Sequence, residues 1–422
     1  MSSATLWLVG ILLTLVVVMA LVIWSIRRHR DPHLRIQCDV GIDSLLPTLA
    51  GLTLGTVVDG NAVEVLENGK CWDAMIERIA SAQGSLHYET FLWKEGELGG
   101  RMAKAFAERA RAGVAVRIML DGNGSRGIGK GERELMEQAG ARVVMFHEVK
   151  LHNIGVLNDR THRKMLIIDG REAFLGGHCV VDHWLGDAED GKHFADVSVW
   201  LRGPIVHSAQ GAFSENWAGE TGELFAGPEC FPPLEAAGEI PAHLVYAKPE
   251  NSAPAVKILH HAAICLARKR IWIQNPYFIP EPDAIDAFGE AVRRGVDVRV
   301  LMPSTSGSDN PMVQHAGHRN FEKLMRNGVR LFEYPHTLLH QKVMTVDGIY
   351  SAVGSTNFDD RSFETNDEVT LGILDRKTAQ RLDAVFERYV ARATEIDLAQ
   401  WSRRSLWHKL KDQAAYSINE LL

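Results

Sequence analysis

The sequence lacks the cysteine patterns that mark disulfide-rich proteins and structural zinc sites. Its five cysteines are scattered, odd in number and never spaced as Cys-x-x-Cys: Cys38, Cys71, Cys179, Cys230 and Cys265. Disulfide frameworks and structural zinc sites use paired cysteines at short, regular spacings. We therefore expect free thiols, which fits a reducing compartment.

An excess of positive charge is also absent. The chain has 46 lysines and arginines against 53 acidic residues, for a net charge of −7. Proteins that bind nucleic acid across a whole face are usually basic, so no nucleic-acid partner is expected, although a local basic cleft stays open. A mixed group of side chains matches no zinc spacing, and we expect no metal there: His178, Cys179, Asp182, His183 and His193.

The long hydrophobic run of the chain lies near its N-terminus, at Leu6–Ile26. About 20 apolar residues suffice for a membrane-spanning helix, and Trp7 and Trp24 stand at the two ends, where aromatic rings favour the interface. The basic stretch 27–30 follows and no Lys or Arg precedes, which predicts a catalytic body on the cytoplasmic side. A cleavable signal peptide is the alternative, but its charge would lie on the other flank.

One eight-residue pattern occurs twice. Residues 162–169 read His-Arg-Lys-Met-Leu-Ile-Ile-Asp, and residues 340–347 read His-Gln-Lys-Val-Met-Thr-Val-Asp. Both follow His-x-Lys-x4-Asp. Segments 111–117 and 293–299 also match, at a similar offset of about 180 residues, which indicates an internal duplication. Helical and strand patterns alternate in both halves, which is typical of α/β folds.

These patterns predict an α/β protein with two homologous lobes, each a mixed sheet flanked by helices. A pseudo-twofold relation between the lobes would bring both motifs to one central cleft. The predicted segments are an anchor (1–30), a juxtamembrane linker (31–59), a first lobe (60–222), a linker (223–243), a second lobe (244–395) and a tail (396–422). The juxtamembrane segment either lies along the membrane, with a short helix near Leu45–Leu54, or is a plain linker. The basic and apolar tail is either an amphipathic helix on an anionic membrane or a cap on the second lobe.

The motif spacing predicts the chemistry. The apolar residues after each lysine predict a strand, on which side chains two apart share a face, so His162 and Lys164 project together, as do His340 and Lys342. Imidazole acts as nucleophile, acid or base, and an ammonium suits a phosphate oxygen. Two such units around one phosphate suffice for phosphoryl transfer through a covalent histidine, with no metal or cofactor.

Other side chains near the motifs are candidates for supporting roles. Asp169 and Asp347 lie an odd number of positions from the histidines, so they point to the opposite face and are expected to be structural. Asp196 and Glu368 occupy matching places downstream, where a carboxylate can fix a histidine tautomer; ordinary acids at strand ends are the alternative. The phosphate would also accept hydrogen bonds from two residues of the second half: Ser355 and Asn357.

The paired motifs resemble the phospholipase D superfamily. The flanking segments look most like its bacterial cardiolipin synthase branch: 203–206, 275–280, 294–299 and 354–368, the last of which includes Asn366. The resemblance covers roughly residues 60–395. It implies that Asp196 orients His162, that Glu368 orients His340, and that the motif aspartates pair with charges. Cys179 stands where many family members carry Asn, which puts in doubt that equivalent side chains of the two halves bind the phosphate.

The resemblance implies a phosphatidyltransferase of the bacterial inner membrane that joins two phosphatidylglycerols to cardiolipin plus glycerol. In this scheme His162 forms a phosphatidyl-histidine and His340 acts as acid and then base, although the two roles could be exchanged. Three alternatives stay open. They are a hydrolytic phospholipase D that releases phosphatidic acid, a nuclease, and an inactive lipid-binding scaffold, which two intact motifs disfavour.

Overall fold

A computed structural model describes residues 3–26, 34, 40–53, 55–148, 159–247 and 254–417. The chain divides into two units, Met1–Arg35 and Ile36–Leu422. The first contains helix α1 (Ser3–Ile26). Among the described residues, no helix has the length and apolar character needed to cross a membrane. The predicted membrane-spanning anchor is therefore not confirmed, and its basic flank, 27–30, lies outside the described residues.

The second unit is built on one 15-stranded mixed sheet, whose strand order is β15-β11-β10-β9-β12-β13-β14-β8-β1-β7-β6-β5-β2-β3-β4. Its first half contains β1 (Val57–Glu67), β2 (Ser85–Thr90), β3 (Ala115–Asp121), β4 (Arg142–Phe146), β5 (Met165–Ile168), β6 (Glu172–Gly176) and β7 (Val197–Arg202). Its second half contains β8 (Ile240–Ala247), β9 (Arg270–Gln274), β10 (Asp297–Pro303), β11 (Arg330–Tyr334), β12 (Val343–Val346), β13 (Tyr350–Gly354), β14 (Glu368–Leu374) and β15 (Thr394–Glu395).

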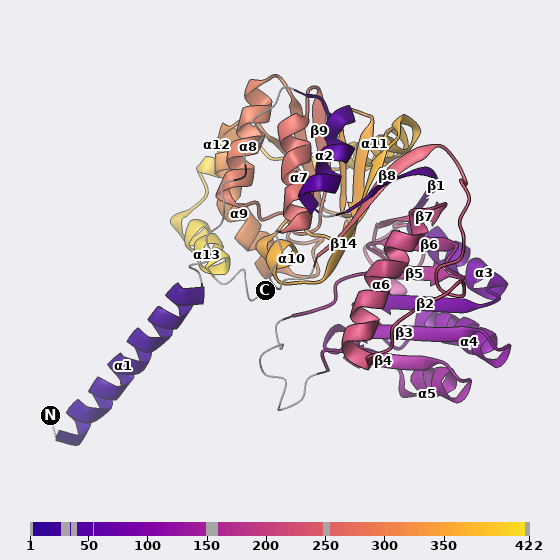
Figure 1. The fold of residues 1–422 in the computed structure, drawn as a ribbon. Coiled ribbons are helices and arrows are strands. Elements are labelled where there is room, and N and C mark those ends of the chain that lie inside the picture. Colours follow the sequence, from indigo (N-terminus) through magenta and orange to yellow (C-terminus); the bar gives the residue numbers. More distant parts are fainter. Residues whose placement is uncertain are drawn as a thin grey trace. The chain divides into compact units, whose positions relative to one another are not determined.

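The two halves repeat the same strand order outward from a central antiparallel pair, β1 with β8 (Figure 1). In each half, three strands run parallel, namely β2-β3-β4 and β9-β10-β11, and the motif strand pairs antiparallel with the first of them. This symmetry confirms the duplication that the sequence predicts. It places the motif strands β5 and β12 at equivalent positions of the sheet.

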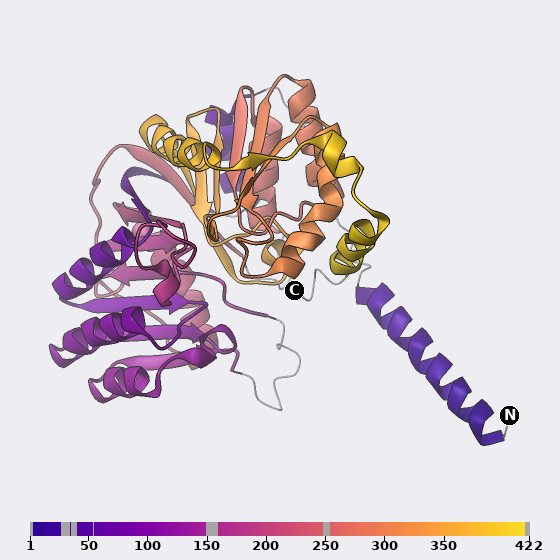
Figure 2. The same ribbon diagram turned by 180° about the vertical axis from the view of Figure 1, so that it is seen from behind.

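Helices cover both faces of each half, as Figures 1 and 2 show from opposite sides. The first half carries α3 (Lys70–Ser81), α4 (Glu97–Arg111), α5 (Lys130–Gln138) and α6 (Val206–Thr221). The second carries α2 (Leu45–Thr53), α7 (Ala255–Leu266), α8 (Pro282–Arg293), α9 (Pro311–Arg326), α10 (Asp360–Glu364) and α11 (Arg376–Val390), followed by α12 (Leu398–Ser402) and α13 (Leu406–Tyr416). Short 3-10 turns lie at Ile42–Ser44, Gly124–Gly127 and Asp182–Trp184.

The motif strand is apolar along its whole length because both of its faces are buried. Met165 and Ile167 face a central core that also contains α6 and α11, whereas Leu166 and Ile168 face the core beneath α3 and α4. Strands buried on both faces have continuous apolar runs rather than alternating ones. Because the central core contains residues of both halves, the predicted lobes pack as one compact unit.

The short helix predicted near Leu45–Leu54 is confirmed as α2, but it is packed into the second half and is not part of a juxtamembrane linker. Leu45, Leu46 and Leu49 are buried on α2 in the core of the second half, where α2 contacts α7. Burial of three leucines stabilises the fold by several kcal/mol, at about 1.5–3 kcal/mol each. This short helix is therefore an integral part of the second half.

Candidate active site

Each motif histidine stands three residues before its strand begins, and its backbone N–H bonds to the backbone of the other half. His162 N donates to Asp367 O (2.9 Å), and His340 N donates to Ala195 O (2.7 Å). Short parallel bridges accompany both contacts, Thr161 with Asp367 and Leu339 with Ala195. The predicted acids, Glu368 and Asp196, directly follow these two acceptors. At each motif, therefore, the backbone of one half is paired with a short segment of the other half.

This pairing places each motif histidine beside the carboxylate of the other half. His162 Nδ1 lies 2.8 Å from Glu368 Oε1, and His340 Nδ1 lies 2.8 Å from Asp196 Oδ2. The expectation that Asp196 orients His162 and Glu368 orients His340 is wrong. The physical reason is the backbone bridge between the halves, because it places each acid beside the histidine of the partner half. Both acids are fully buried.

The two carboxylates have further donors, which differ between the halves. Ser355 Oγ donates to Glu368 Oε2, and Trp184 Nε1 donates to Asp196 Oδ2 (2.7 Å). Burial raises the pKa of Asp196, but the positive charges around it outweigh that effect and lower the pKa to about 2. The pKa of Glu368 is also lowered, because His162 and Lys164 outweigh its burial.

The ionised carboxylates fix the histidine tautomers. A carboxylate only accepts hydrogen bonds, so each Nδ1 carries the proton and each Nε2 carries a lone pair. Burial, together with the two motif lysines, lowers the pKa of His162 and of His340 to about 4. Both imidazoles are therefore neutral near pH 7 before a substrate arrives, with Nε2 as the reactive atom.

The two lysines are placed differently. Lys342 Nζ donates to His340 Nε2 (2.8 Å) and to His340 O (2.7 Å). Lys164 Nζ donates to His162 O (2.5 Å) and lies 5.3 Å from the centre of the Phe91 ring. Burial lowers the pKa of Lys342 to about 7 and also lowers that of Lys164. Within the described ranges of the chain, His162 Nε2 has no hydrogen-bond partner.

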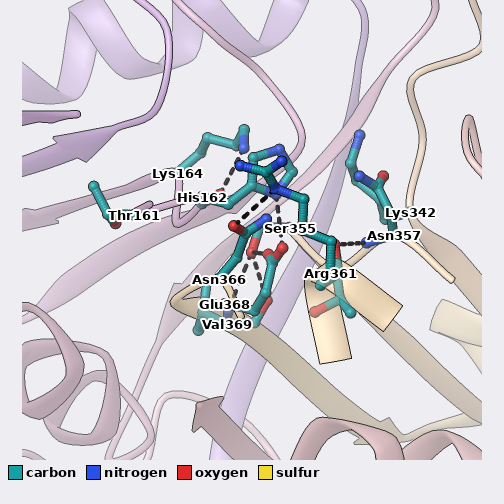
Figure 3. A network of polar contacts seen from close by, with 12 residues as sticks. Thr161, His162, Lys164, Lys342, Ser355, Asn357, Arg361, Asn366, Glu368 and Val369 are labelled. Carbon is teal, nitrogen blue, oxygen red and sulfur yellow. Dashed lines mark hydrogen bonds and ion pairs between the residues drawn. The ribbon is translucent and has the colours of Figure 1, made fainter. Parts of the chain in front are cut away.

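The remaining predicted residues of the second half lie around this centre (Figure 3). Asn357 has a buried side-chain oxygen, Oδ1, with no partner among the described residues, and its backbone N donates to Ser362 Oγ. Asn366 accepts from Arg361 Nε (3.4 Å) at the end of α10. Oδ1 of Asn357 can therefore accept a hydrogen bond from a ligand hydroxyl, whereas Asn366 contacts a neighbouring arginine.

The equivalent position of the first half carries Cys179. Its Sγ contacts Gly177 O at 3.8 Å, and burial raises the pKa of the thiol, so the group is neutral. Gly177 has its own constraint, because a Cβ there would lie 2.3 Å from Asp196 Oδ1. The amide of Asn357 thus has no counterpart in the first half, and the surroundings of the centre are asymmetric.

The motif aspartates are structural, as predicted, although their partners are backbone amides rather than charged groups. Asp169 accepts from the N–H groups of residues 83–85, and Asp347 accepts from those of residues 268–270. The shortest bond in each set measures 2.7 Å. Both aspartates have positive φ, near 52° and 55°, where the chain turns out of the motif strand. They tie that turn to the start of the neighbouring strand, β2 or β9, which pairs antiparallel with the motif strand.

The group that resembles a metal cluster in the sequence makes other contacts. His178 uses both ring nitrogens, with Ser198 Oγ (2.7 Å) and Asn68 O (3.0 Å) as partners. Asp182 accepts from the backbone N of Leu98 (2.9 Å). These two side chains hold loops in place and are not arranged around a common point.

Two aromatic residues near the histidines are absent from the sequence prediction. The Trp184 ring lies 5.0 Å from the His340 ring, and the Phe91 ring lies 5.2 Å from the His162 ring, both edge to face. Neither belongs to a repeated motif. Trp184 stands in a 3-10 turn with no sequence signal apart from its position shortly before Asp196.

A duplicated fold that joins two His-x-Lys-x4-Asp motifs at one centre defines the phospholipase D superfamily. A family model described as "Cardiolipin synthase, PLD-like domain" matches residues 75–180 and 261–390. Cardiolipin synthase 2 of Bacillus anthracis is 33% identical over 364 residues, which cover 85% of this chain and 70% of that protein. The cardiolipin synthase of Listeria welshimeri is 31% identical over 366 residues, covering 86% and 76%. The chain belongs to the cardiolipin synthase family of phospholipase D-like proteins.

Solved structures agree on the fold. A phosphatidylserine synthase from Haemophilus influenzae matches 88% of this chain and 98% of its own, with a TM-score of 0.65 and 12% identity. A polyphosphate kinase from Porphyromonas gingivalis matches 93% of this chain and 58% of its own, with a TM-score of 0.54 and 12% identity. At such low identity, the likeness concerns the architecture alone.

Proposed function

We propose that this protein is a phosphatidyltransferase that joins two phosphatidylglycerols to cardiolipin and glycerol. The observation that carries the proposal is the pair of crossed histidine–carboxylate contacts, each at 2.8 Å, in a chain of the cardiolipin synthase family. They prepare two neutral imidazoles from different halves. A transfer between two hydroxyl groups uses one imidazole as nucleophile and the other as a proton carrier.

In the first step, Nε2 of His162 attacks phosphorus, and the bond from phosphorus to the glycerol headgroup breaks. The departing oxygen takes a proton from Nε2 of His340, and this nitrogen receives that proton from Lys342 Nζ, which already donates to it. In the second step, His340 removes a proton from a hydroxyl of the second phosphatidylglycerol and returns it to Lys342. That oxygen attacks phosphorus, the bond to His162 breaks, and cardiolipin forms. Lys164 and Lys342 offset the charge on the phosphate oxygens, and Asn357 donates from its amide.

The difference between the histidines supports this assignment of roles. The lone pair on Nε2 of His340 already accepts a hydrogen bond from Lys342 at 2.8 Å, whereas Nε2 of His162 has no such partner in the described part of the chain. A free lone pair suits a nucleophile, and a nitrogen bonded to an ammonium suits proton exchange. An anionic phosphodiester between the lysines would also raise both histidine pKa values, which helps His340 to hold the proton.

Product analysis by mass spectrometry tests the proposal. The full-length enzyme is given phosphatidylglycerol in mixed micelles, beside His162→Ala and, as a matched control, the exposed His408→Ala. Cardiolipin plus glycerol is expected from the wild type and from the control, and a loss of at least about 10⁴-fold from His162→Ala. Phosphatidic acid as the sole product would identify a hydrolase. Absence of phospholipid turnover would contradict both readings.

The N-terminal anchor and the cytoplasmic placement of the catalytic body belong to the same proposal. They rest on the apolar run at Leu6–Ile26 and on the basic residues that follow it. Protease added to sealed, oriented inner-membrane vesicles tests the orientation. The C-terminus should be cleaved only from the cytoplasmic face, and cleavage only from the other face would overturn the placement.

A further inference from the structure

The C-terminal helices form a positively charged pocket on α9, and none of its lining residues belongs to the catalytic centre. Its volume is about 440 Å³. Five basic side chains line it, against two carboxylates, in a chain whose net charge is negative: Arg319, Lys323, Arg326, Arg404 and Lys409. The local excess of positive charge therefore contrasts with the chain as a whole.

The two carboxylates are already paired with cations. Asp412, which is buried, forms an ion pair with Arg404 Nη1 and accepts a hydrogen bond from His315 Nδ1, both at 2.9 Å. Glu322 pairs with Arg326 at 2.7 Å. The guanidinium of Arg404 on the same carboxylate disfavours a metal ion between Asp412 and the nearby histidines. The positive charge of the other basic side chains remains in excess.

Those other side chains have weak or neutral partners that a phosphate could replace. Lys323 pairs with Asp286 at 3.0 Å, with both side chains more than half exposed. Lys409 donates to Ser402 O at 3.1 Å and lies 3.9 Å from Glu322, which is a long ion pair. Exposed ion pairs contribute about 0–1 kcal/mol, so their exchange for a phosphate costs little.

Helix α13 has a docked face and an exposed face. The first fits the hypothesis of a cap on the second lobe, and the second fits that of an amphipathic helix on a membrane. Its inner face is docked on α9 by buried Asp412 and Ala415. Its outer face presents Leu406, Trp407 and Leu410, which are 79%, 75% and 62% exposed. Positions three and four apart share a side of a helix, and Leu410 stands four from Leu406 and three from Trp407, so these three form one apolar surface beside the pocket-lining Lys409. An exposed apolar helix face beside basic residues is typical of helices that lie in a bilayer interface.

We propose that α13 lies on an anionic phospholipid bilayer, with its outer face in the interface and the pocket on α9 holding one lipid phosphate. The occupant follows from charge complementarity, because phosphate matches the basic pocket and acyl chains match the adjacent leucines and tryptophan. This contact is separate from the catalytic centre, and it does not depend on the proposed reaction.

Amide hydrogen exchange of residues 398–417 tests the proposal with the full-length protein in bilayer nanodiscs. Discs of phosphatidylcholine alone are compared with discs that also contain phosphatidylserine, and a third arm adds inorganic phosphate to the phosphatidylcholine discs. We expect exchange in this segment to slow by at least about 10-fold on the anionic discs only, since two to three basic groups near such a surface favour binding by that amount or more. No substrate turnover is needed, so this result is independent of the proposed function.

Two variants separate the apolar surface from the pocket. The first combines Leu406→Ser, Trp407→Ser and Leu410→Ser, and the second combines Arg319→Gln with Lys409→Gln. Both should lose the protection on anionic discs. The matched controls should keep it: Leu224→Ser, where the leucine is 82% exposed, and Lys130→Gln, where the lysine side chain is 90% exposed.

Three outcomes would overturn the proposal. They are equal protection on neutral and anionic discs, protection that survives the charge variant, and protection that free phosphate alone reproduces. Exchange in detergent without lipid shows whether each variant leaves α13 docked on α9. If α13 undocks in the double charge variant, the single variant Lys323→Gln serves in its place, and it should weaken the protection by about 5-fold.

Discussion

Because each acid bonds to the histidine of the other half, replacing one acid should have the same effect on the reaction as removing that histidine. Glu368→Gln replaces the acceptor of His162 Nδ1, and Asp196→Asn replaces the acceptor of His340 Nδ1. An amide can donate to Nδ1, which moves the imidazole proton to Nε2 and inverts the tautomer. Glu368→Gln should then behave as His162→Ala does. Asp196→Asn should behave as His340→Ala does.

The magnitude follows from the buried contacts. Each pair is a charge-assisted hydrogen bond of 2.8 Å to a carboxylate that is fully buried. Such a bond is worth about 1.5–3 kcal/mol, or about 10- to 150-fold in rate. The inverted tautomer adds a further loss, because Nε2 no longer has a lone pair for attack or proton uptake. A total of about 10⁴-fold is expected for either variant, as for other histidine–carboxylate pairs.

A chromogenic substrate separates the two steps. In phosphatidyl-p-nitrophenol the leaving group departs as a stable anion and needs no acid. Asp196→Asn should therefore release one equivalent of nitrophenol rapidly and then stall, because the base for the second step is lost. Glu368→Gln should give no burst, because His162 cannot attack.

The comparison with the histidine variants does not depend on which histidine is the nucleophile. In a crossed centre, Glu368→Gln matches His162→Ala. In a same-half centre, Asp196→Asn would match His162→Ala, and that result would refute the pairing. Glu215, a partly exposed acid on α6, pairs with the buried Arg163, and Glu215→Gln serves as a control that should keep the burst.

Three further outcomes follow from the geometry. On the acid side, kcat/KM should fall only near pH 4, where His162 gains a proton and loses its nucleophilic lone pair. On the alkaline side it should fall above about pH 7, where Lys342 loses its charge. A fall in kcat/KM near pH 6.5 on the acid side would contradict the effect of burial on the His162 pKa. Gly177→Ala should abolish activity by displacing the carboxylate that orients the second histidine, whereas Gly100→Ala, with open space at Cβ on α4, should be neutral or raise Tm slightly. Asp169→Asn should lower stability by about 1–3 kcal/mol in urea unfolding and leave kcat nearly unchanged at temperatures where the variant is folded.

The repeated spacing was sufficient to predict the duplicated α/β architecture, the motif strands and the four motif side chains at one centre. Each of these features depends on local pattern and on symmetry, which a sequence carries. The pairing of acids with histidines depends on a backbone bridge between segments such as 161–162 and 367. Its geometry arises only when the halves pack, so a single chain read in order gives no sign of the crossing.

Two helices were missed or shortened because buried polar residues interrupt their apolar pattern. On α6, Gln210 accepts from His87 Nδ1 (2.9 Å) and Asn216 donates to Glu89 (2.9 Å), so polar side chains occupy the buried face. The apolar spacing of the sequence predicts a helix only over Phe321–Asn327, which corresponds to the last turns of α9. Its first turns bury Gln314, whose amide donates to Pro276 O at 2.6 Å. A hydrophobic periodicity cannot detect a face that is buried through hydrogen bonds.

The differences between the halves matter more for the reaction than their likeness. A duplicated fold alone would supply two equivalent histidines, but a two-step transfer needs one to attack and the other to carry a proton. The second carboxylate donor is Ser355 on one side and Trp184 on the other. Only His340 accepts a hydrogen bond from its own motif lysine at Nε2. This contact leaves the lone pair on Nε2 of His162 free and engages that of His340, and it supports the proposed roles of His162 as nucleophile and His340 as proton carrier.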